Sequence, residues 1–598
     1  MSTSSRSSKD EDTYSIIKET VLRNAVQHGG KARSDNVISK VIAQRPKLRN
    51  QMKILIPQIT QAVDELNRLS LAQQEELLAQ TSTDESEVRK KNGKVRVLPE
   101  LPEAQMGRVV TRFPPEPNGY PHIGHAKAAI IDEEYARLYN GKFILRFDDT
   151  NPLNEKIEYY EAIKDGLDWL GVMPNIIKNT SDDIELLCDY GKKLVMTGGG
   201  YICSCSQTRI RELRAKGIAC ECRSASTESE ERLQTFFDGS LEPNTAIIRF
   251  KGNIADTNTA MRDPTLFRII DGQHPKLGKS NRVWPTYDFA APIEDSLDGV
   301  THALRTKEYE LRNALYYAIL DKLLLRKPII MEFSRLEFDC MPVSKRKIVP
   351  LINNGLVQGW TDPRLPTLAA LKRRGFMPEA IRKFVLSLGL TLSETTPPFE
   401  SLEAFNRKII DPTSIRLFFV KNPTIIMIKN GHSQEVILKN HPNFDLGQRH
   451  ITVSTLFYID ENDAINLGVG DEVRLIELCN VIITDVVSDI QVQPNLVEIN
   501  DVENTRNGRV LIAERTGEAI NHKMRKIQWV AKNDALPYNV LVPKQLYDGE
   551  NFNSNSLECF QGYAESFIGS LNKGTIIQLV RFGFCRIDDR NTAIFTHR

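Results

Sequence analysis

The 598-residue sequence predicts a multidomain protein that combines an α/β body, helical segments and an all-β C-terminal third. Three observations predict this class. The chain is too long for a single hydrophobic core, so several domains are expected. Strand and helix patterns alternate from Gly107 onwards, and after about Phe405 the apolar residues recur with a period of two. The formal charges nearly cancel, at +1, so any nucleic-acid-binding surface must be a local patch.

The N-terminal region contains no targeting or membrane signal that we recognise. No apolar run approaches the roughly 20 residues that span a bilayer. The first residues lack the apolar middle of a secretory signal, and Asp10, Glu11 and Asp12 argue against an organelle transit peptide. Nine cysteines, four of them clustered, favour a reducing compartment over a disulfide framework. We therefore expect a cytoplasmic protein with no membrane association.

Residues from about 12 to 80 show helical spacing, and Thr81 to Gln105 form a polar, charged linker. From Gly107 a strand at Val109–Phe113, a helix after His125, a strand at Lys142–Phe147 and a helix at Ile157–Leu170 follow one another. This βαβα order begins a doubly wound, Rossmann-like sheet, which binds ligands at the carboxyl ends of its strands.

The second half of that sheet is expected further along the chain. Strands are predicted at Val283–Ala290, Asp298–Arg305 and Ile329–Phe333, with a helix over Glu308–Leu325. The segment between the two halves is predicted to be an insertion.

The stretch from Arg112 to Lys127 predicts an anion site. Prolines keep its first half extended, Asn118-Gly119 permits a turn, and a helix begins near His125. Free backbone N–H groups at a helix start favour a phosphate. His122 and His125, on either side of Gly124, can donate to that anion. The alternative is that the two histidines only cap the helix.

Asp148 begins the loop D-D-T-N-P at the carboxyl end of a predicted strand. It is a candidate to bind a substrate amino group, and the alternative is a helix cap with a proline turn. The loop from Met341 to Ile348, M-P-V-S-K-R-K-I, offers Lys345 as a point charge for a polyphosphate. Alone it is typical of a solvated charge run, but its place after a completed α/β half strengthens the functional interpretation.

Two C-x-C pairs, fourteen residues apart, predict a structural zinc site. Four thiolates complete a tetrahedral shell and leave no open position for catalysis. The alternative is four free or buried thiols. The candidate ligands are Cys203, Cys205, Cys220 and Cys222.

Short strands with turn residues between them fill the last third of the chain. They indicate one or two antiparallel barrels, which frequently contact single-stranded RNA. The predicted strands are Ile415–Val420, Thr424–Lys429, Ile451–Tyr458, Asp471–Leu478 and Gly574–Ile587.

These motifs together resemble a known family. The run R-F-P-P-E-P-N-G-x-x-H-I-G-H is similar to the first signature of class I aminoacyl-tRNA synthetases, closely that of the glutamyl/glutaminyl branch. D-D-T-N-P, W-P-T-Y-D-F-A, G-V-T-H-A-L-R-T-K-E-Y, E-F-S-R-L, V-S-K-R-K and W-T-D-P-R-L-P-T follow in order. From about Gly107 to the end, the chain resembles glutamyl-tRNA synthetases of the archaeal/eukaryotic type. The N-terminal helices match less strongly.

The resemblance implies a division of the chain into six segments. They are a helical extension with its linker (1–105), the first Rossmann half (106–202), an insertion that binds the tRNA acceptor end and holds the zinc site (203–282), the second Rossmann half (283–340), the lysine loop with a helical stem-contact domain (341–404), and two anticodon-binding barrels (405–598).

The resemblance also implies a two-step reaction with ATP, Mg²⁺, L-glutamate and tRNA(Glu), catalysed by a monomer. Glutamate forms an adenylate, and the terminal adenosine of the tRNA then receives the glutamyl group. His122, His125 and Lys345 would stabilise the phosphates, with Gly124, Lys127 and Ser344 as further ATP-binding residues. The sequence leaves open whether tRNA(Gln) is also charged with glutamate.

By the same resemblance, Arg112, Glu116, Asp148, Tyr287 and Arg305 hold the amino acid. Arg305 decides for glutamate, because an arginine fork matches a carboxylate and would be left unpaired by an amide. The alternative is that Arg305 forms a salt bridge at the strand end. Pro342 departs from the family pattern, because the first lysine of the usual K-M-S-K loop is absent. Glu116 is shared with the glutaminyl branch and does not decide specificity.

Three competing functions remain at this point. A glutaminyl-tRNA synthetase would share the fold and the chemistry. An H-x-G-H nucleotidyltransferase would need neither the second lysine loop nor the barrels. A synthetase-derived, non-catalytic scaffold would not need His122, His125 and Lys345 to be intact.

Overall fold

The computed structural model describes residues 17–18, 20–22, 24–26, 30–44, 52–70, 73–74, 77, 98–224, 230–339, 341–393, 396–487, 509–521, 523–549 and 551–598. The chain divides into two compact units, Met1–Val95 and Arg96–Arg598. Most of the predicted linker Thr81–Gln105 lies outside the described residues, which resume at residue 98.

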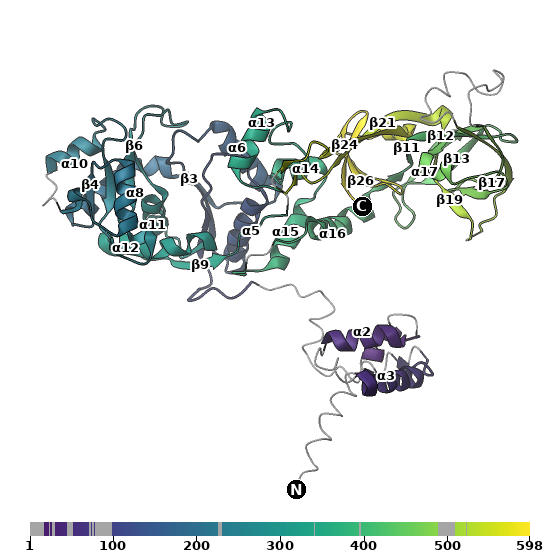
Figure 1. Cartoon of the computed structure of the whole chain (residues 1–598), viewed down its shortest axis with the longest axis horizontal. Helices are drawn as coiled ribbons and strands as arrows, with labels where there is room; N and C mark the ends of the chain where they lie inside the picture. The colour runs from purple at the N-terminus through teal and green to yellow at the C-terminus, as the bar shows by residue number, and fades with distance from the viewer. Residues whose placement is uncertain are drawn as a thin grey trace, which may run out of the picture. The chain divides into compact units, whose positions relative to one another are not determined.

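The first unit contains the predicted helices. The helices α2 (Ser34–Gln44) and α3 (Met52–Leu66) lie against one another (Figure 1). They share one apolar core, to which Val37, Val41 and Ile59 contribute fully buried side chains. Asn67 closes this core: its side chain accepts a hydrogen bond from the Ala32 N–H at 2.7 Å and donates one to the Ala32 carbonyl at 3.0 Å.

The second unit begins with the predicted α/β body. Strands β1 (Val110–Phe113), β2 (Lys142–Phe147) and β3 (Ile176–Asn179) are parallel and lie in that order. Helices α5 (Ile123–Leu138) and α6 (Ile157–Trp169) connect them. Burial on both faces accounts for the continuous apolar run in β2, as expected for a parallel strand.

The second half of this sheet lies beside β1. Strand β8 (His302–Thr306) pairs in parallel with β9 (Ile329–Phe333), and the Thr301 N–H donates to the Val110 carbonyl at 2.9 Å. The predicted helix over Glu308–Leu325 begins as a 3₁₀ turn, Lys307–Arg312, and is α-helical only as α12 (Asn313–Leu323). The two halves therefore form one doubly wound arrangement, as predicted.

The predicted strand Val283–Ala290 is wrong in length and in place. Only β7 (Val283–Pro285) is extended, and it belongs to an antiparallel sheet with β4 (Gly200–Cys203), β5 (Ile247–Phe250) and β6 (Thr265–Ile269). From Tyr287 the chain is helical, as α11 (Tyr287–Leu297). Phe289, Ala290 and Ile293 are buried on this helix, a spacing that fits 3.6 residues per turn as well as it fits a buried strand.

Helices surround that antiparallel sheet and continue after β9. Those around the sheet are α7 (Ile184–Met196), α8 (Gln207–Lys216), α9 (Glu221–Ser224) and α10 (Glu230–Phe237). The later ones are α13 (Lys345–Asn353), α14 (Leu368–Arg374), α15 (Pro378–Leu388) and α16 (Phe399–Ile410). Gly217 ends α8 in the left-handed conformation, at φ 66°, which glycine adopts without a Cβ clash.

The C-terminal third forms two seven-stranded sheets that close on themselves. In the first sheet the edge strands are β10 (Ile415–Leu417) and β11 (Phe419–Lys421), and in the second they are β19 (Arg525–Ile527) and β20 (Trp529–Ala531). Each pair of edge strands is separated by a single residue, so each sheet must curl until its edges meet. Barrels predicted from the period-two pattern are therefore present, but they were predicted to be antiparallel and each described sheet also contains parallel strand pairs.

The remaining strands of the C-terminal third differ from the prediction mainly in length, because a long predicted strand is often divided into two shorter ones. Ile451–Tyr458 is divided between β14 and β15, and Gly574–Ile587 between β25 and β26, where Arg581 turns the chain at φ 63°. The other strands of the two seven-stranded sheets are β12 (Pro423–Ile428), β15 (Leu456–Asp460), β16 (Glu472–Leu475), β17 (Asn480–Val487), β18 (Val510–Gly517), β21 (Ala535–Pro543), β24 (Leu557–Glu565), β25 (Ile576–Leu579), β26 (Gly583–Asp589) and β27 (Thr592–His597), with the short helix α17 (Glu461–Ile465). Two further pairs form separate two-stranded sheets: β13 (Gln434–Lys439) with β14 (Gln448–Val453), and β22 (Tyr547–Asp548) with β23 (Asn551–Phe552).

Helix α14 contacts β26 and β27 of one barrel (Figure 1). Arg373 on α14 pairs with Asp588 at 2.6 Å, and Arg374 donates to the Thr596 carbonyl at 3.0 Å. Among the described helices, none is long and apolar enough to cross a membrane.

Candidate active site

A cavity of about 1010 Å³ lies at the carboxyl ends of β1, β2 and β8. This is where a doubly wound sheet binds its ligands. Six of the residues predicted from the sequence line it: Arg112, Glu116, His125, Asp148, Tyr287 and Arg305.

The histidine pair caps α5 and remains able to donate. The Nδ1 of His122 accepts from the Gly124 N–H at 3.1 Å, and the Nδ1 of His125 accepts from the His122 N–H at 3.2 Å. An imidazole that accepts at Nδ1 without carrying a charge has its proton on Nε2. The capping interpretation and the donor interpretation are therefore compatible, because they use different nitrogens.

Burial keeps both rings neutral. It lowers the pKa of His125 to about 4, with a further contribution from Arg335, and it lowers the pKa of His122 well below its ordinary value, with contributions from His125 and Arg335. The ring centroids are 3.9 Å apart. A Cβ at Gly124 would lie 2.9 Å from the His122 ring, so a side chain at this position would displace the ring. Two neutral N–H donors thus stand together at the start of α5.

Arg305 reaches the cavity from the end of β8 without a carboxylate partner among the described residues. Its Nη1 donates to the Asn313 side-chain oxygen at 3.0 Å, while its Nε is buried and has no hydrogen-bond partner. The rings of Tyr287, Tyr309 and Tyr316 lie 5.8, 5.1 and 5.3 Å from the guanidinium carbon. Aromatic faces favour a cation here but leave its charge without a counter-ion. The salt-bridge interpretation of Arg305 is therefore wrong for the part of the chain that the structure describes.

Asp148 and Asp132 also offer unused polar atoms to this region. The Oδ2 of Asp148 is buried and unpaired, whereas its Oδ1 accepts from the Arg146 Nε at 2.8 Å and from the Thr180 hydroxyl at 3.0 Å. Burial raises the pKa of Asp148, against the pull of Arg146. Asp132, on α5, likewise leaves Oδ1 buried without a partner. Buried polar atoms without partners are costly, so such atoms on a cavity wall indicate a site for a ligand.

Arg112 is held by a buried ion-pair network below the cavity. Its Nε donates to Asp295 at 2.9 Å and its Nη1 to the Leu304 carbonyl at 2.8 Å. Arg146 and Tyr316 donate to the same Asp295 carboxylate at 2.8 and 2.9 Å. We refer to Arg112, Arg146, Asp295 and Tyr316 as the Asp295 network. Arg112 lines the cavity, but two of its three guanidinium nitrogens already have partners.

Glu116 and Tyr287 also line the cavity. Burial raises the pKa of Glu116, which the side chain of Asn118 and that of Asn151 oppose. Tyr287 is the first residue of α11, and its ring centroid lies 5.4 Å from that of Tyr309.

Five of the six predicted ATP-binding residues do not line the cavity: His122, Gly124, Lys127, Ser344 and Lys345. Lys127 is buried on α5, and its ammonium donates to the carbonyl and to the hydroxyl of Ser334, the latter at 3.1 Å. Burial lowers the pKa of Lys127 to about 8. Ser344 is the N-cap residue of α13, and Lys345 begins that helix. The Lys345 ammonium lies 5.7 Å from the Tyr159 ring centroid, outside the cavity wall.

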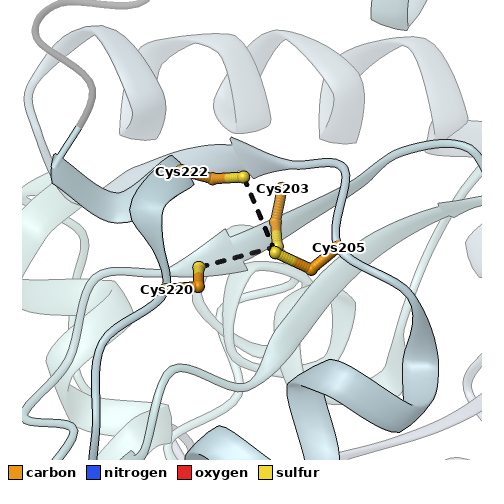
Figure 2. A group of neighbouring side chains, drawn as sticks. All are labelled: Cys203, Cys205, Cys220 and Cys222. Atoms are coloured by element: carbon orange, nitrogen blue, oxygen red, sulfur yellow. Dashed lines mark hydrogen bonds between the residues drawn. The ribbon is translucent and has the colours of Figure 1, made fainter.

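The four predicted zinc ligands do meet. Figure 2 shows their sulfur atoms pointing toward one another from the end of β4, the turn after it and the start of α9. All four Sγ atoms lie within 4.8 Å of one another. Cys203 and Cys220 are 3.8 Å apart, as are Cys205 and Cys222. Zinc–sulfur bonds of about 2.3 Å in a tetrahedron place the sulfurs about 3.8 Å apart, so the cluster fits Zn²⁺.

Arg249 on β5 supports the cluster with positive charge. Its Nη1 lies 3.6 Å from the Cys220 sulfur and 3.9 Å from the Cys203 sulfur. Four thiolates around Zn²⁺ carry a net negative charge, which a donor of this kind stabilises.

Sequence reasoning missed several residues at the cavity. Tyr309 lies in the quoted motif G-V-T-H-A-L-R-T-K-E-Y, and its aromatic ring in a polar run was a signal. Arg146 is a charged residue inside the apolar run F-I-L-R-F, which is a signal of burial in a pair. Asp132 and Asp295 each have a charged neighbour in the sequence, so neither gave that signal. Asn313 gave no signal, because asparagine at a helix start is common.

Comparisons with known proteins agree with this geometry. The family model described as tRNA synthetases class I (E and Q), catalytic domain, matches residues 108–412. Two models described as the anti-codon binding domain of the same family match residues 414–501 and 526–588.

Curated relatives match along nearly the whole chain. Glutamate–tRNA ligases from Nitrosopumilus maritimus and Cenarchaeum symbiosum are each 45% identical, over 98% of this chain and 100% of their own. The Thermococcus kodakarensis glutamate–tRNA ligase is 36% identical over the same shares of both chains. The chain therefore belongs to the class I tRNA synthetases of the glutamate and glutamine (E and Q) branch.

Proposed function

We propose that this protein is a glutamate–tRNA ligase, which activates L-glutamate with ATP and transfers it to the 3′-terminal adenosine of tRNA(Glu). The observation that carries the choice of glutamate is Arg305, buried at the cavity wall with no carboxylate partner among the described residues. A γ-carboxylate would supply the missing counter-ion. The amide of glutamine would leave the charge uncompensated.

The remaining wall fits the α-ammonium group of the substrate. The Oδ2 of Asp148 is a buried acceptor without a donor. Tyr287 lies beside Arg305 on the cavity wall, where its ring can contact the side chain of the substrate. Arg112 keeps Nη2 for the substrate, since Nε and Nη1 are bound to Asp295 and Leu304.

The first chemical step is an attack of the substrate α-carboxylate on the α-phosphorus of ATP, which forms the glutamyl-adenylate and releases pyrophosphate. A carboxylate is already a nucleophile at neutral pH, so this step needs no general base. The protein contributes position and stabilisation of the developing phosphate charge. The Nε2–H groups of His122 and His125 and the ammonium of Lys345 are the proposed donors, with Mg²⁺ bound to the ATP phosphates as part of the substrate.

In the second step a ribose hydroxyl of the terminal adenosine attacks the glutamyl carbonyl carbon, and AMP leaves. Lys345 must approach the cavity from the start of α13 to act in the first step. Lys127 holds Ser334 and is the least suited of the predicted ATP ligands. Gly124 serves the site by leaving room for the His122 ring.

We also propose that residues 203–282 bind the acceptor end and that the two barrels bind the anticodon, in a monomeric, cytoplasmic protein. The basic helix α8 supports the first assignment: Arg214 on α8 lines the cavity together with Arg268 on β6.

The cysteine cluster is proposed to hold one structural Zn²⁺ per chain. The sulfur spacing and the Arg249 donor support it. The test is metal analysis of the purified protein, with Cys220→Ser and Cys222→Ser as variants that each remove one ligand. About one zinc per wild-type chain and a clear loss in both variants are expected. Well under one zinc per wild-type chain would exclude the site.

The function is tested by charging of unfractionated archaeal tRNA with labelled glutamate and, separately, with labelled glutamine. Wild-type protein should charge glutamate alone, and Arg305→Ala should lower kcat/KM for glutamate by about 10³-fold. Lys164→Ala, which alters an exposed ion pair, is the control and should charge as wild type does. Charging by glutamine would favour the glutaminyl enzyme, and charging by neither would favour a nucleotidyltransferase or a scaffold.

A further inference from the structure

Arg305 and Glu332 are register partners on the parallel strands β8 and β9. Neighbouring strands lie about 4.8 Å apart, so paired side chains of opposite charge are expected to attract one another. Arg305 and Glu332 nevertheless form no direct ion pair, although both side chains are described. A third side chain separates these two charges.

Asn313, the first residue of α12, lies between them. Its side-chain oxygen accepts from Arg305 Nη1 at 3.0 Å, and its side-chain NH₂ donates to Glu332 Oε1 at 2.5 Å. This orientation of the amide is the one that satisfies both neighbours, because a guanidinium can only donate and a carboxylate can only accept. Glu332 thus fixes the amide, and the amide fixes Arg305.

We propose that Asn313 is a positioning residue that determines the specificity for a carboxylate side chain. It orients Arg305 with a neutral acceptor and holds Glu332 away, so the guanidinium keeps its full charge for a substrate carboxylate. The inference rests on the proposed function, because it assigns the substrate γ-carboxylate to Arg305.

The alternative occupants of position 313 show why an amide is suited to this position. An aspartate would pair with Arg305 and supply internally the charge that the substrate should bring. An alanine would leave nothing between Arg305 and Glu332, and Glu332 could then form the cross-strand ion pair. In both cases an internal carboxylate competes with the γ-carboxylate of glutamate.

The test is the dependence of tRNA charging on glutamate concentration at saturating ATP and tRNA. Asn313→Ala should raise the KM for glutamate by about tenfold to a hundredfold, with kcat and the KM for ATP within about threefold of wild type. Asn313→Asp, which has the same shape, should raise it at least as much. Asn466→Ala, at an exposed helix end in a barrel, is the control and should leave the KM unchanged.

Glu332 distinguishes positioning from a merely structural role. In the double variant Asn313→Ala with Glu332→Gln, no carboxylate remains to compete, and the KM should return to within about threefold of wild type. Glu332→Gln alone completes the cycle: the glutamine oxygen can accept the same hydrogen bond from Asn313, and a change of about threefold or less is expected. Thermal unfolding of each variant shows whether it is folded.

Two results would overturn the inference. One is an unchanged KM for glutamate in folded Asn313→Ala and Asn313→Asp proteins. The other is a double variant as impaired as Asn313→Ala, which would give Asn313 a structural role only. Failure of the proposed function is distinguishable from both, because in that case the wild-type protein itself would charge no glutamate, and the inference would fail with it.

Discussion

The buried arginines near the carboxyl ends of β1, β2 and β8 differ in how their charge is balanced. In the Asp295 network, Arg112 and Arg146 share one buried carboxylate. Arg305 is 5% exposed, yet it contacts a neutral amide and three aromatic rings instead of a carboxylate. The charges of Arg112 and Arg146 are balanced by the chain itself, whereas Arg305 has no carboxylate partner among the described residues, and we propose that a ligand supplies one.

This difference distinguishes the Asp295 network, which stabilises the fold, from Arg305, which we propose binds the substrate. A buried charge is tolerated when it is paired and hydrogen-bonded, and the pair is strongly destabilising once one partner is removed. Although burial opposes its ionisation, Arg112 and Arg146 lower the pKa of Asp295 to about 2, so its charge is part of the folded state. Arg305 has no such internal partner among the described residues, and its removal should affect binding more than stability.

The largest effect is expected from Asp295→Asn. This change leaves two buried arginines without their shared carboxylate, and the free energy of unfolding should fall by about 3–5 kcal/mol. Chemical denaturation monitored by circular dichroism measures it. The matched comparison is Arg305→Met, which strands no carboxylate and should change the free energy of unfolding by less than about 1 kcal/mol. If the Arg305→Met protein were as unstable as the Asp295→Asn protein, Arg305 would also stabilise the fold, and the distinction between the two would be wrong.

The histidine pair offers a third way to bury an ionisable group, beside the paired arginines and Arg305: burial lowers the pKa of both rings, so they are neutral. The pKa of His125 is about 4 in the folded protein, below its ordinary value of 6.5. Between these values the unfolded chain binds more protons, so stability should fall as pH drops from 6.5 toward 4, by about 1–3 kcal/mol. His125→Asn should lose less stability than wild type between pH 7 and pH 5, measured by thermal unfolding. Equal losses in the two proteins would mean that His125 is not held neutral.

The smallest effect is expected from Tyr316→Phe, because this change removes a single hydroxyl group. Tyr316 contacts both Asp295 and Arg305. Its hydroxyl donates to Asp295 at 2.9 Å, and its ring lies 5.3 Å from the Arg305 guanidinium carbon. Loss of the hydroxyl should lower the free energy of unfolding by about 1 kcal/mol. The ring remains, so the KM for glutamate should stay within about threefold of wild type. A large rise in that KM with unchanged stability would show that the hydroxyl acts on the substrate side.

The fold was largely predictable because its signals are local. β2 shows the apolar residues Phe143, Ile144, Leu145 and Phe147 in the sequence, and the two histidines on either side of Gly124 show where α5 begins. The strand predicted at Val283–Ala290 failed because a short buried apolar run fits both a strand and a helix. Predicted runs in the barrels were broken where single residues such as Arg581 turn the chain.

By itself, the sequence determined the α/β body, the β-barrel region, the family, and six of the residues that line the cavity, because each depends on spacing along the chain. Only the tertiary structure decided what those residues do with their charges. In the folded chain, Lys127 donates to Ser334, and Arg112 pairs with the buried Asp295 of α11. Asn313 lies between Arg305 and Glu332. Charge balance depends on which side chains meet across elements far apart in the sequence, and that proximity follows from packing.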